Sequence, residues 1–278
     1  MCNRLFSLMV CLCVAFSAAS QQAEDTLVLF EKKQVVYLLA DSVNIRKEPN
    51  TESALVAKLP IGTRLTILNK SKTASRINNI LMPWYLVAFN EKETGYVWGG
   101  KIALASFRSN RNPDIVFHFG MEKIESGNSV YQIRVQQLGK ELQRLSFQGF
   151  KGYLKRHTCT NISNKGLSSV DDILQVDGFA ESCGEDAGSI VFFWANNKLS
   201  LVERLTDMAD GGFFDRAYFV YPADMEGKKD QVIKREEAGE VLFDENQHVA
   251  SWYSTNVKYD KNLSTLYIWN GSKLVKAN

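Results

Sequence analysis

The residue types that most often carry chemistry are sparse in this sequence. Its three histidines, His118, His157 and His248, have no paired spacing that would bring two imidazoles onto one metal ion. The sequence also lacks a phosphate-cradling glycine loop, a Gly-x-Ser-x-Gly nucleophile elbow and a zinc-binding cysteine cluster. These patterns predict a protein with no catalytic residues, no metal and no cofactor, and therefore not an enzyme.

Two short acidic segments that contain or flank glycine are the remaining candidates for chemistry. One spans residues 181–186 and the other residues 207–215. Their carboxylates are Glu181, Glu185 and Asp186 in the first, and Asp207, Asp210 and Asp215 in the second. Clustered carboxylates can bind calcium or act as acid and base, but this spacing matches no calcium loop and solvated turns explain it as well. We favour turns and keep an envelope hydrolase as the alternative.

The first twenty residues have the pattern of a secretory signal peptide. Arg4 precedes an apolar run over residues 5–16, and four small residues follow at 17–20. The run is shorter than the roughly 20 residues of a membrane-spanning helix, which disfavours a retained anchor. Cys11 and Cys13 both follow bulky residues, which disfavours a lipoprotein signal. We therefore expect a secreted or periplasmic protein with no membrane span after signal removal.

Two cysteines, Cys159 and Cys183, remain once residues 1–20 are removed. An even pair in an oxidising compartment usually forms a disulfide. The alternative is a single reactive thiol, which needs a partner base and a motif that the sequence does not contain. The sequence therefore predicts a Cys159–Cys183 bridge.

Composition and charge describe an ordinary folded chain. Of 278 residues, 45% are hydrophobic and 23% are charged, with 33 Lys and Arg against 31 Asp and Glu. Because the charges balance, nothing steers the molecule towards nucleic acid or an anionic membrane. The length fits two domains, with a break in pattern near residue 106.

Residues 27–105 contain short strand-like runs separated by turn residues. The runs are 35–39, 55–59, 64–68, 84–89 and 95–98, with a polar loop expected at 69–79. Five short strands without a helical period indicate a small closed barrel or sandwich.

Several spaced elements then agree with a known family. They are Val43-Asn44-Ile45-Arg46, Pro49, Val56 to Leu59, Gly62-Thr63, Trp84-Tyr85-Leu86-Val87 and Gly95-Tyr96-Val97. In this order they resemble the bacterial SH3 domain of envelope and cell-wall proteins, over about residues 34–104. The segment Lys70 to Pro83 is longer than the usual connection. Many such proteins continue into a cysteine endopeptidase, but the sequences around Cys159 and Cys183 do not resemble its nucleophile motif.

The resemblance implies a module that engages peptidoglycan or a peptide. Aromatic rings with a polar end can fill a core or line a groove. We assign Trp84 to the core, and take Tyr85, Tyr96, Trp98 and Arg46 as the candidate ligand-binding residues. If the rings are buried at the domain boundary instead, the barrel has a purely structural role.

The rest of the chain has a β pattern too. Residues 106–113 have no periodicity and are expected to be a linker, and residues 114–278 to form a larger antiparallel β domain. The segments 190–202 and 266–275 each have a hairpin pattern, which suggests a propeller-like domain or a sandwich. Residues 168–174 are a candidate short helix.

These observations predict an all-β protein of two domains. The favoured function is a non-catalytic, exported binding or scaffold protein of the cell envelope, with peptidoglycan or an envelope peptide as partner and no nucleic-acid binding.

Overall fold

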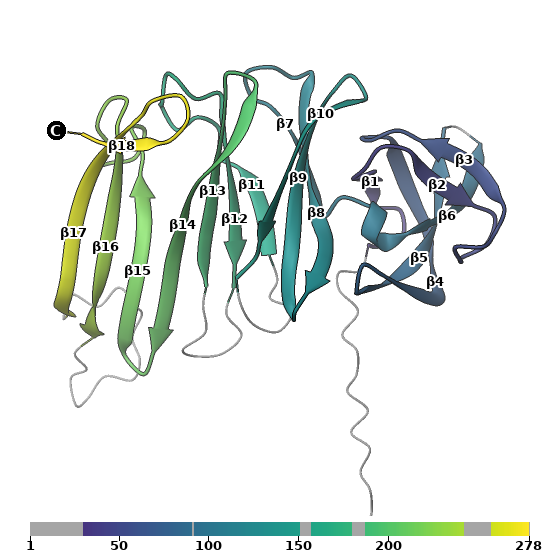
Figure 1. Cartoon of the computed structure of the whole chain (residues 1–278), viewed down its shortest axis with the longest axis horizontal. Helices are drawn as coiled ribbons and strands as arrows, with labels where there is room; N and C mark the ends of the chain where they lie inside the picture. The colour runs from purple at the N-terminus through teal and green to yellow at the C-terminus, as the bar shows by residue number, and fades with distance from the viewer. Residues whose placement is uncertain (1–29, 91, 151–156, 180–186, 242–256, 278) are drawn as a thin grey trace, which may run out of the picture.

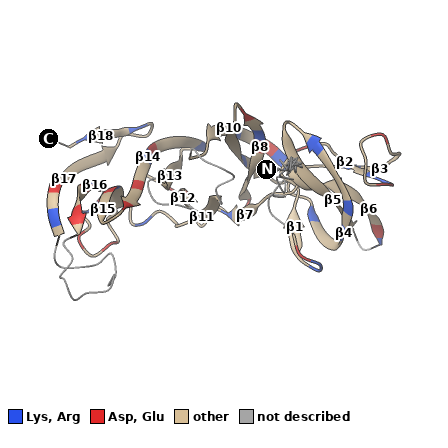
Figure 2. Ribbon diagram, turned by 90° about the horizontal axis from the view of Figure 1, so that it is seen from below, with Lys and Arg blue, Asp and Glu red and all other residues tan. Residues whose placement is uncertain are grey.

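The computed structural model describes residues 30–90, 92–150, 157–179, 187–241 and 257–277. The expected all-β class is confirmed: within these ranges, the one helical element is a 3-10 turn, η1 (Gly99–Lys101). A barrel at one end is followed by a long row of strands that ends at β17 and β18 (Figure 1). A view at right angles places the barrel and β17 at opposite ends (Figure 2). Residues 1–20 and Cys183 lie outside the described residues.

The barrel is a curved six-stranded sheet in the order β1-β4-β5-β6-β2-β3. Its strands are β1 (Val35–Tyr37), β2 (Val43–Arg46), β3 (Leu55–Leu59), β4 (Arg64–Ile77), β5 (Ile80–Phe89) and β6 (Glu93–Trp98). Alternate side chains enter the interior, where Ile45, Leu65, Tyr85 and Val87 are fully buried together. The strands predicted from the sequence pattern of residues 64–68 and 84–89 are therefore confirmed, as parts of β4 and β5.

The polar stretch 69–79, expected to be a loop, is mostly strand. β4 continues to Ile77 and β5 begins at Ile80, so a two-residue turn joins them. Asn78 and Asn79 have φ values of 53° and 62°. Asparagine tolerates this left-handed conformation, and two such residues make the turn that suits a twisted hairpin. The segment that departs from the usual SH3 length is thus an extended β4–β5 hairpin.

The chain that follows the barrel, which we call the second domain, contains two antiparallel sheets. The four-stranded sheet has the order β10-β9-β8-β7, and the eight-stranded sheet follows chain order from β11 to β18. The first comprises β7 (Ala105–Arg108), β8 (Ile115–Glu125), β9 (Asn128–Gln137) and β10 (Lys140–Gln148). The second comprises β11 (His157–Asn161), β12 (Asp172–Gly178), β13 (Gly188–Ala195), β14 (Lys198–Asp210), β15 (Phe213–Val220), β16 (Val232–Val241), β17 (Val257–Trp269) and β18 (Leu274–Lys276). The interval 106–113, expected to be a linker, includes most of β7.

The two sheets pack face to face around aromatic side chains. Phe147 of β10 lies 4.8 Å from Phe192 of β13, and Phe117 of β8 lies 5.6 Å from Trp194, measured between ring centroids. The other face of β13 carries Phe193, which packs against Trp269 in a separate core. The four-stranded sheet and β13 thus pack as in the expected sandwich, but the eight-stranded sheet also curls into a half-barrel around the second core. Burial on both faces explains the unbroken apolar run of β13.

Residues 168–174 form turns and the start of β12, so the expected short helix is wrong. Asp172 is fully buried and accepts hydrogen bonds from the backbone N–H of Asn110 at 2.9 Å and from Nδ2 of Asn161 at 2.9 Å. The Ser109 hydroxyl also donates to it. The carboxylate therefore fastens the segment before β8 to the eight-stranded sheet.

Candidate functional site

Two of the four candidate ligand residues lie together on the outer face of the barrel. Arg46 of β2 and Tyr96 of β6 are directly opposite each other, and Arg46 is also opposite Leu55 of β3. In an antiparallel pair, opposite residues point to the same side of the sheet. Arg46 and Tyr96 are partly exposed, and Leu55 is 55% exposed. We call these three residues the Arg46 surface.

A hydrogen bond to the backbone holds the guanidinium of Arg46 in place. Nη1 of Arg46 donates to the carbonyl oxygen of Ser53 at 2.6 Å, in the turn between β2 and β3. The remaining N–H groups of a guanidinium can bind a carboxylate in a bidentate manner, and the neighbouring tyrosine ring can stack on a flat or apolar group. Through Leu55 the Arg46 surface extends onto β3, an edge strand of the sheet, so a peptide backbone can reach it.

The other two candidate residues are interior. Tyr85 is fully buried, its hydroxyl accepts a hydrogen bond from the backbone N–H of Phe30 at 3.2 Å, and burial raises its pKa. Trp98 is 4% exposed, and its Nε1 donates to the carbonyl oxygen of Ser75 at 3.0 Å. This corrects the expectation that they line a ligand face: neither ring can contact a ligand in this structure.

The barrel can now be compared with known families. Residues 41–103 match the bacterial SH3 domain. No curated protein and no solved structure was found to match the chain. The match agrees with the resemblance seen in the sequence, and it ends where η1 leads into the second domain. No helix within the described residues is long and apolar enough to cross a membrane.

The extended hairpin covers part of the outer face of the SH3 domain. Its Ser75 receives the indole N–H of Trp98 on the carbonyl oxygen and that of Trp84 on the hydroxyl, the latter at 2.7 Å. At its tip, Nδ2 of Asn78 donates to the carbonyl oxygen of Glu122, and the N–H of Ile124 donates to the carbonyl oxygen of Asn78 at 3.1 Å. The hairpin therefore joins the SH3 domain to β8.

The junction between the domains also buries a histidine. His118 of β8 has no exposed surface, its Nδ1 lies 2.8 Å from the Ser106 hydroxyl, and its Nε2 has no hydrogen-bond partner among the described residues. A Cβ on Gly62 of the SH3 domain would lie 3.2 Å from that Nε2. Burial lowers the pKa of His118 to about 4, so the ring is neutral near pH 7.

Of the predicted disulfide, one half is described. Cys159 on β11 is buried against the aromatic core and forms no bridge within the described residues, and burial raises the pKa of its thiol. A raised pKa leaves the thiol protonated, which disfavours a nucleophilic role. Cys183 lies outside the described residues, so the Cys159–Cys183 bridge stays a prediction.

The two acidic segments differ in what the structure describes. Segment 181–186 lies outside the described residues. The other belongs to the β14–β15 hairpin, where Asp207 is opposite Arg216 and burial raises its pKa. Within the described ranges, no three His, Cys, Asp or Glu side chains come together as a metal site.

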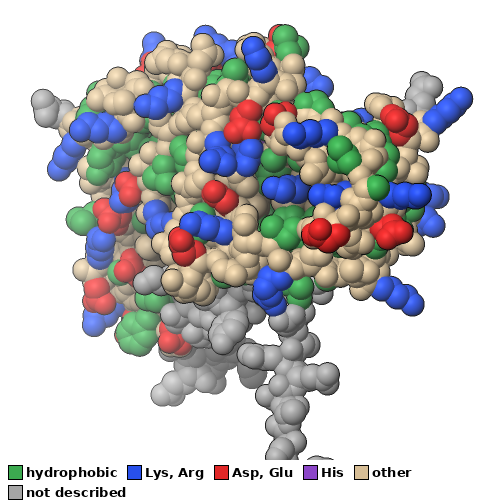
Figure 3. Space-filling view, turned by 45° about the vertical axis from the view of Figure 1, so that its right-hand side comes forward, with side chains coloured by type: hydrophobic (Ala, Val, Ile, Leu, Met, Phe, Trp, Pro, Cys, Tyr) green, Lys and Arg blue, Asp and Glu red, His purple; other side chains and the backbone are tan. Residues whose placement is uncertain are grey.

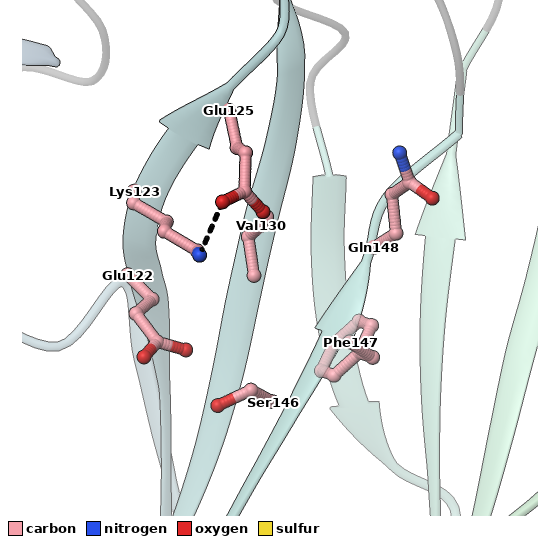
Figure 4. Close-up of a pocket in the computed structure, with 7 residues that line it drawn as sticks. All are labelled: Glu122, Lys123, Glu125, Val130, Ser146, Phe147 and Gln148. Atoms are coloured by element: carbon pink, nitrogen blue, oxygen red, sulfur yellow. Dashed lines mark hydrogen bonds and ion pairs between the residues drawn. The ribbon is translucent and has the colours of Figure 1, made fainter. Parts of the chain in front are cut away.

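A pocket that sequence reasoning missed lies between β8, β9 and β10 (Figure 4). Its volume is about 370 Å³, and its polar lining includes Glu122, Lys123, Ser146 and Gln148. These residues sit on three strands and share no motif. They are brought together by strand register and by a bulge in β8, which the sequence does not signal.

Proposed function

We propose that this chain is an exported, non-catalytic binding protein of the cell envelope, whose SH3 domain binds peptidoglycan or an envelope peptide through the Arg46 surface. The observation that carries the proposal is the family match over residues 41–103, combined with Arg46 and Tyr96, which are opposite each other and partly exposed on the outer face of the barrel. The space-filling view with the barrel brought forward shows charges of both signs among hydrophobic side chains (Figure 3). Such a mixed surface suits a ligand with both polar and apolar groups.

A separate observation supports a scaffold role for the barrel. Trp84 and Trp98 are buried in the same core as Phe117 and Trp194 of the second domain. Part of the SH3 domain therefore packs against its neighbour and is unavailable to a ligand. The proposal assigns binding to the remaining open face and positioning to the covered face.

The test is retention of the full chain on insoluble peptidoglycan. Arg46→Gln combined with Tyr96→Leu removes the charge and the ring while keeping similar side-chain volumes. We expect this variant to lose at least fivefold in retained protein, because both contacts are removed at one surface. Arg64→Gln, at an exposed arginine of β4, is the matched control and should behave as the native chain.

Two results would contradict the proposal. Equal retention of the double variant and the native chain would move binding away from the Arg46 surface. No retention of any of the proteins would remove the cell-wall partner and leave the scaffold role.

A further inference from the structure

The pocket between β8, β9 and β10 is a second candidate ligand-binding site. It belongs to the second domain and does not include the Arg46 surface. Val130 of β9 supplies an apolar side chain to its lining, and the polar groups come from β8 and β10 (Figure 4). Phe147 of β10 also borders the pocket, but its ring is buried in the core between the two sheets. A volume of about 370 Å³ is at the small end of ligand sites in proteins.

A β-bulge shapes this pocket. The pairing of β8 with β9 shifts between Met121 and Lys123, so Glu122 is an extra residue in its strand. A bulge of this kind turns two successive side chains towards one side of the sheet, and bulges often re-aim side chains near functional sites. Here they are Glu122 and Lys123, and both line the pocket. Without the bulge one of the two would point to the opposite face.

The charges of the pocket are only partly compensated. Nζ of Lys123 donates to Oε1 of Glu125 at 2.8 Å, so these two groups neutralise each other. Oε2 of Glu122 is buried and receives no hydrogen bond within the described part of the chain. A buried acceptor without a partner is costly, and a ligand that donates to it recovers that cost.

We infer that this pocket binds a primary ammonium group carried on an aliphatic stem, as in the side chain of lysine. The ammonium supplies three N–H donors and one positive charge. Glu122 offers the unpaired carboxylate oxygen, and Ser146 and Gln148 offer further acceptors. The methylenes of the stem lie against Val130, which a small ion alone would leave uncovered.

The extended hairpin of the SH3 domain supports the wall of the pocket. Asn78 binds the carbonyl oxygen of Glu122, and Nδ2 of Asn79 donates to the carbonyl oxygen of Ile124 at 3.1 Å. These bonds hold the backbone on both sides of Lys123. The bulge is therefore fixed before a ligand arrives, which lowers the entropy cost of binding.

The test is a titration of the isotope-labelled full chain, followed by the NMR signals of the backbone amides of Val130 and Ser146. The probe is Nα-acetyl-lysine N-methylamide, and its norleucine counterpart has the same stem without the amine. We expect saturable shifts with the lysine probe and at least tenfold weaker binding of the norleucine probe. Glu122→Gln should weaken binding of the lysine probe at least tenfold, whereas Glu52→Gln, on an exposed turn of the barrel, should leave it unchanged.

Three results would overturn the inference. They are equal binding of the two probes, equal binding of the lysine probe by the native chain and the Glu122→Gln variant, and tighter binding of glucosamine than of the lysine probe. If the Glu122→Gln variant does not fold, the comparison of probes on the native chain still decides. Retention on peptidoglycan is measured separately at the Arg46 surface, so the two proposals fail or hold independently.

Discussion

The junction with the SH3 domain and the far end of the eight-stranded sheet use similar residues in opposite ways. At the junction, aromatic and titratable side chains are buried between the domains. Trp98 is 4% exposed and His118 is fully buried, and both are surrounded by elements far apart in the sequence. The contacts at the junction hold two domains together.

At the far end of the sheet, the aromatic rings of Phe214, Tyr218 and Tyr259 and the guanidinium of Arg216 remain partly exposed on β15 and β17. The guanidinium of Arg216 lies over the rings of Phe214 and Tyr218, at 5.5 and 5.7 Å from their centroids. Its Nε donates to Glu237 at 2.8 Å, and the hydroxyl of Tyr218 donates to the same carboxylate at 3.0 Å. Tyr259, next to Phe214, is 45% exposed.

The difference shows that coverage by a second domain, and not residue type, decides how much each of these side chains contributes to the free energy of unfolding. A ring enclosed on all sides loses all its contacts when truncated, whereas a ring on an open sheet loses few. Changes at the junction should therefore affect the whole molecule, and changes at β15–β17 should have small and local effects.

The largest expected effect is at Trp98. Trp98→Ala should lower the free energy of unfolding by about 3–5 kcal/mol, because it leaves a cavity at the junction and removes the hydrogen bond to Ser75. Tyr259→Ala should cost less than about 1 kcal/mol. Denaturation by urea measures both values. A similar loss of unfolding free energy in both variants would show that coverage by a second domain does not determine the contribution of these rings.

The next effect is a dependence of stability on pH that originates at His118. Its pKa is about 4 in the folded chain and about 6.5 when unfolded, so the folded state disfavours the proton. The stability from this group is complete above pH 6.5 and is lost as the pH falls towards 4. At 1.36 kcal/mol per pKa unit, the loss is about 3 kcal/mol.

Unfolding measured from pH 7 to pH 4 checks this prediction. A His118→Gln variant should lack this component of the pH dependence, whatever its stability at pH 7. An identical pH profile for the variant and the native chain would show that other groups produce the acid sensitivity.

Most strands could be predicted because their signals are local. Alternation over 64–68, the turn residues around Pro49 and Gly62, and the asparagines at 196–197 act within a few residues of the strands they define. The extended β4–β5 hairpin could not be predicted in this way. Its polar residues resemble a loop, and the groups that order it, Trp84, Trp98 and the backbone of β8, are remote in sequence.

The candidate site was predictable in part for the same reason. The aromatic residues of the barrel were recognised as candidates from the sequence. Whether each ring is buried or exposed depends on the strand register and on the parts of the chain that cover it. Tyr85 points into the barrel and Trp98 into the junction, which leaves Tyr96 beside Arg46 on the outside. The Glu122 pocket depends on a bulge and on strand register, neither of which has a sequence motif.

The smallest expected effect compares two neighbouring glutamates of β16. Glu237 is 6% exposed and accepts hydrogen bonds from Arg216 and Tyr218, whereas Glu236, on the other face, pairs with Lys261 at 2.9 Å in a more exposed position. Glu237→Gln should cost about 1–2 kcal/mol, because it weakens two hydrogen bonds to a buried charge. Glu236→Gln should cost less than about 1 kcal/mol, because exposed ion pairs contribute little. Urea denaturation of the two variants measures the difference, and a larger loss for Glu236→Gln would show that burial does not rank the interactions at this end of the sheet.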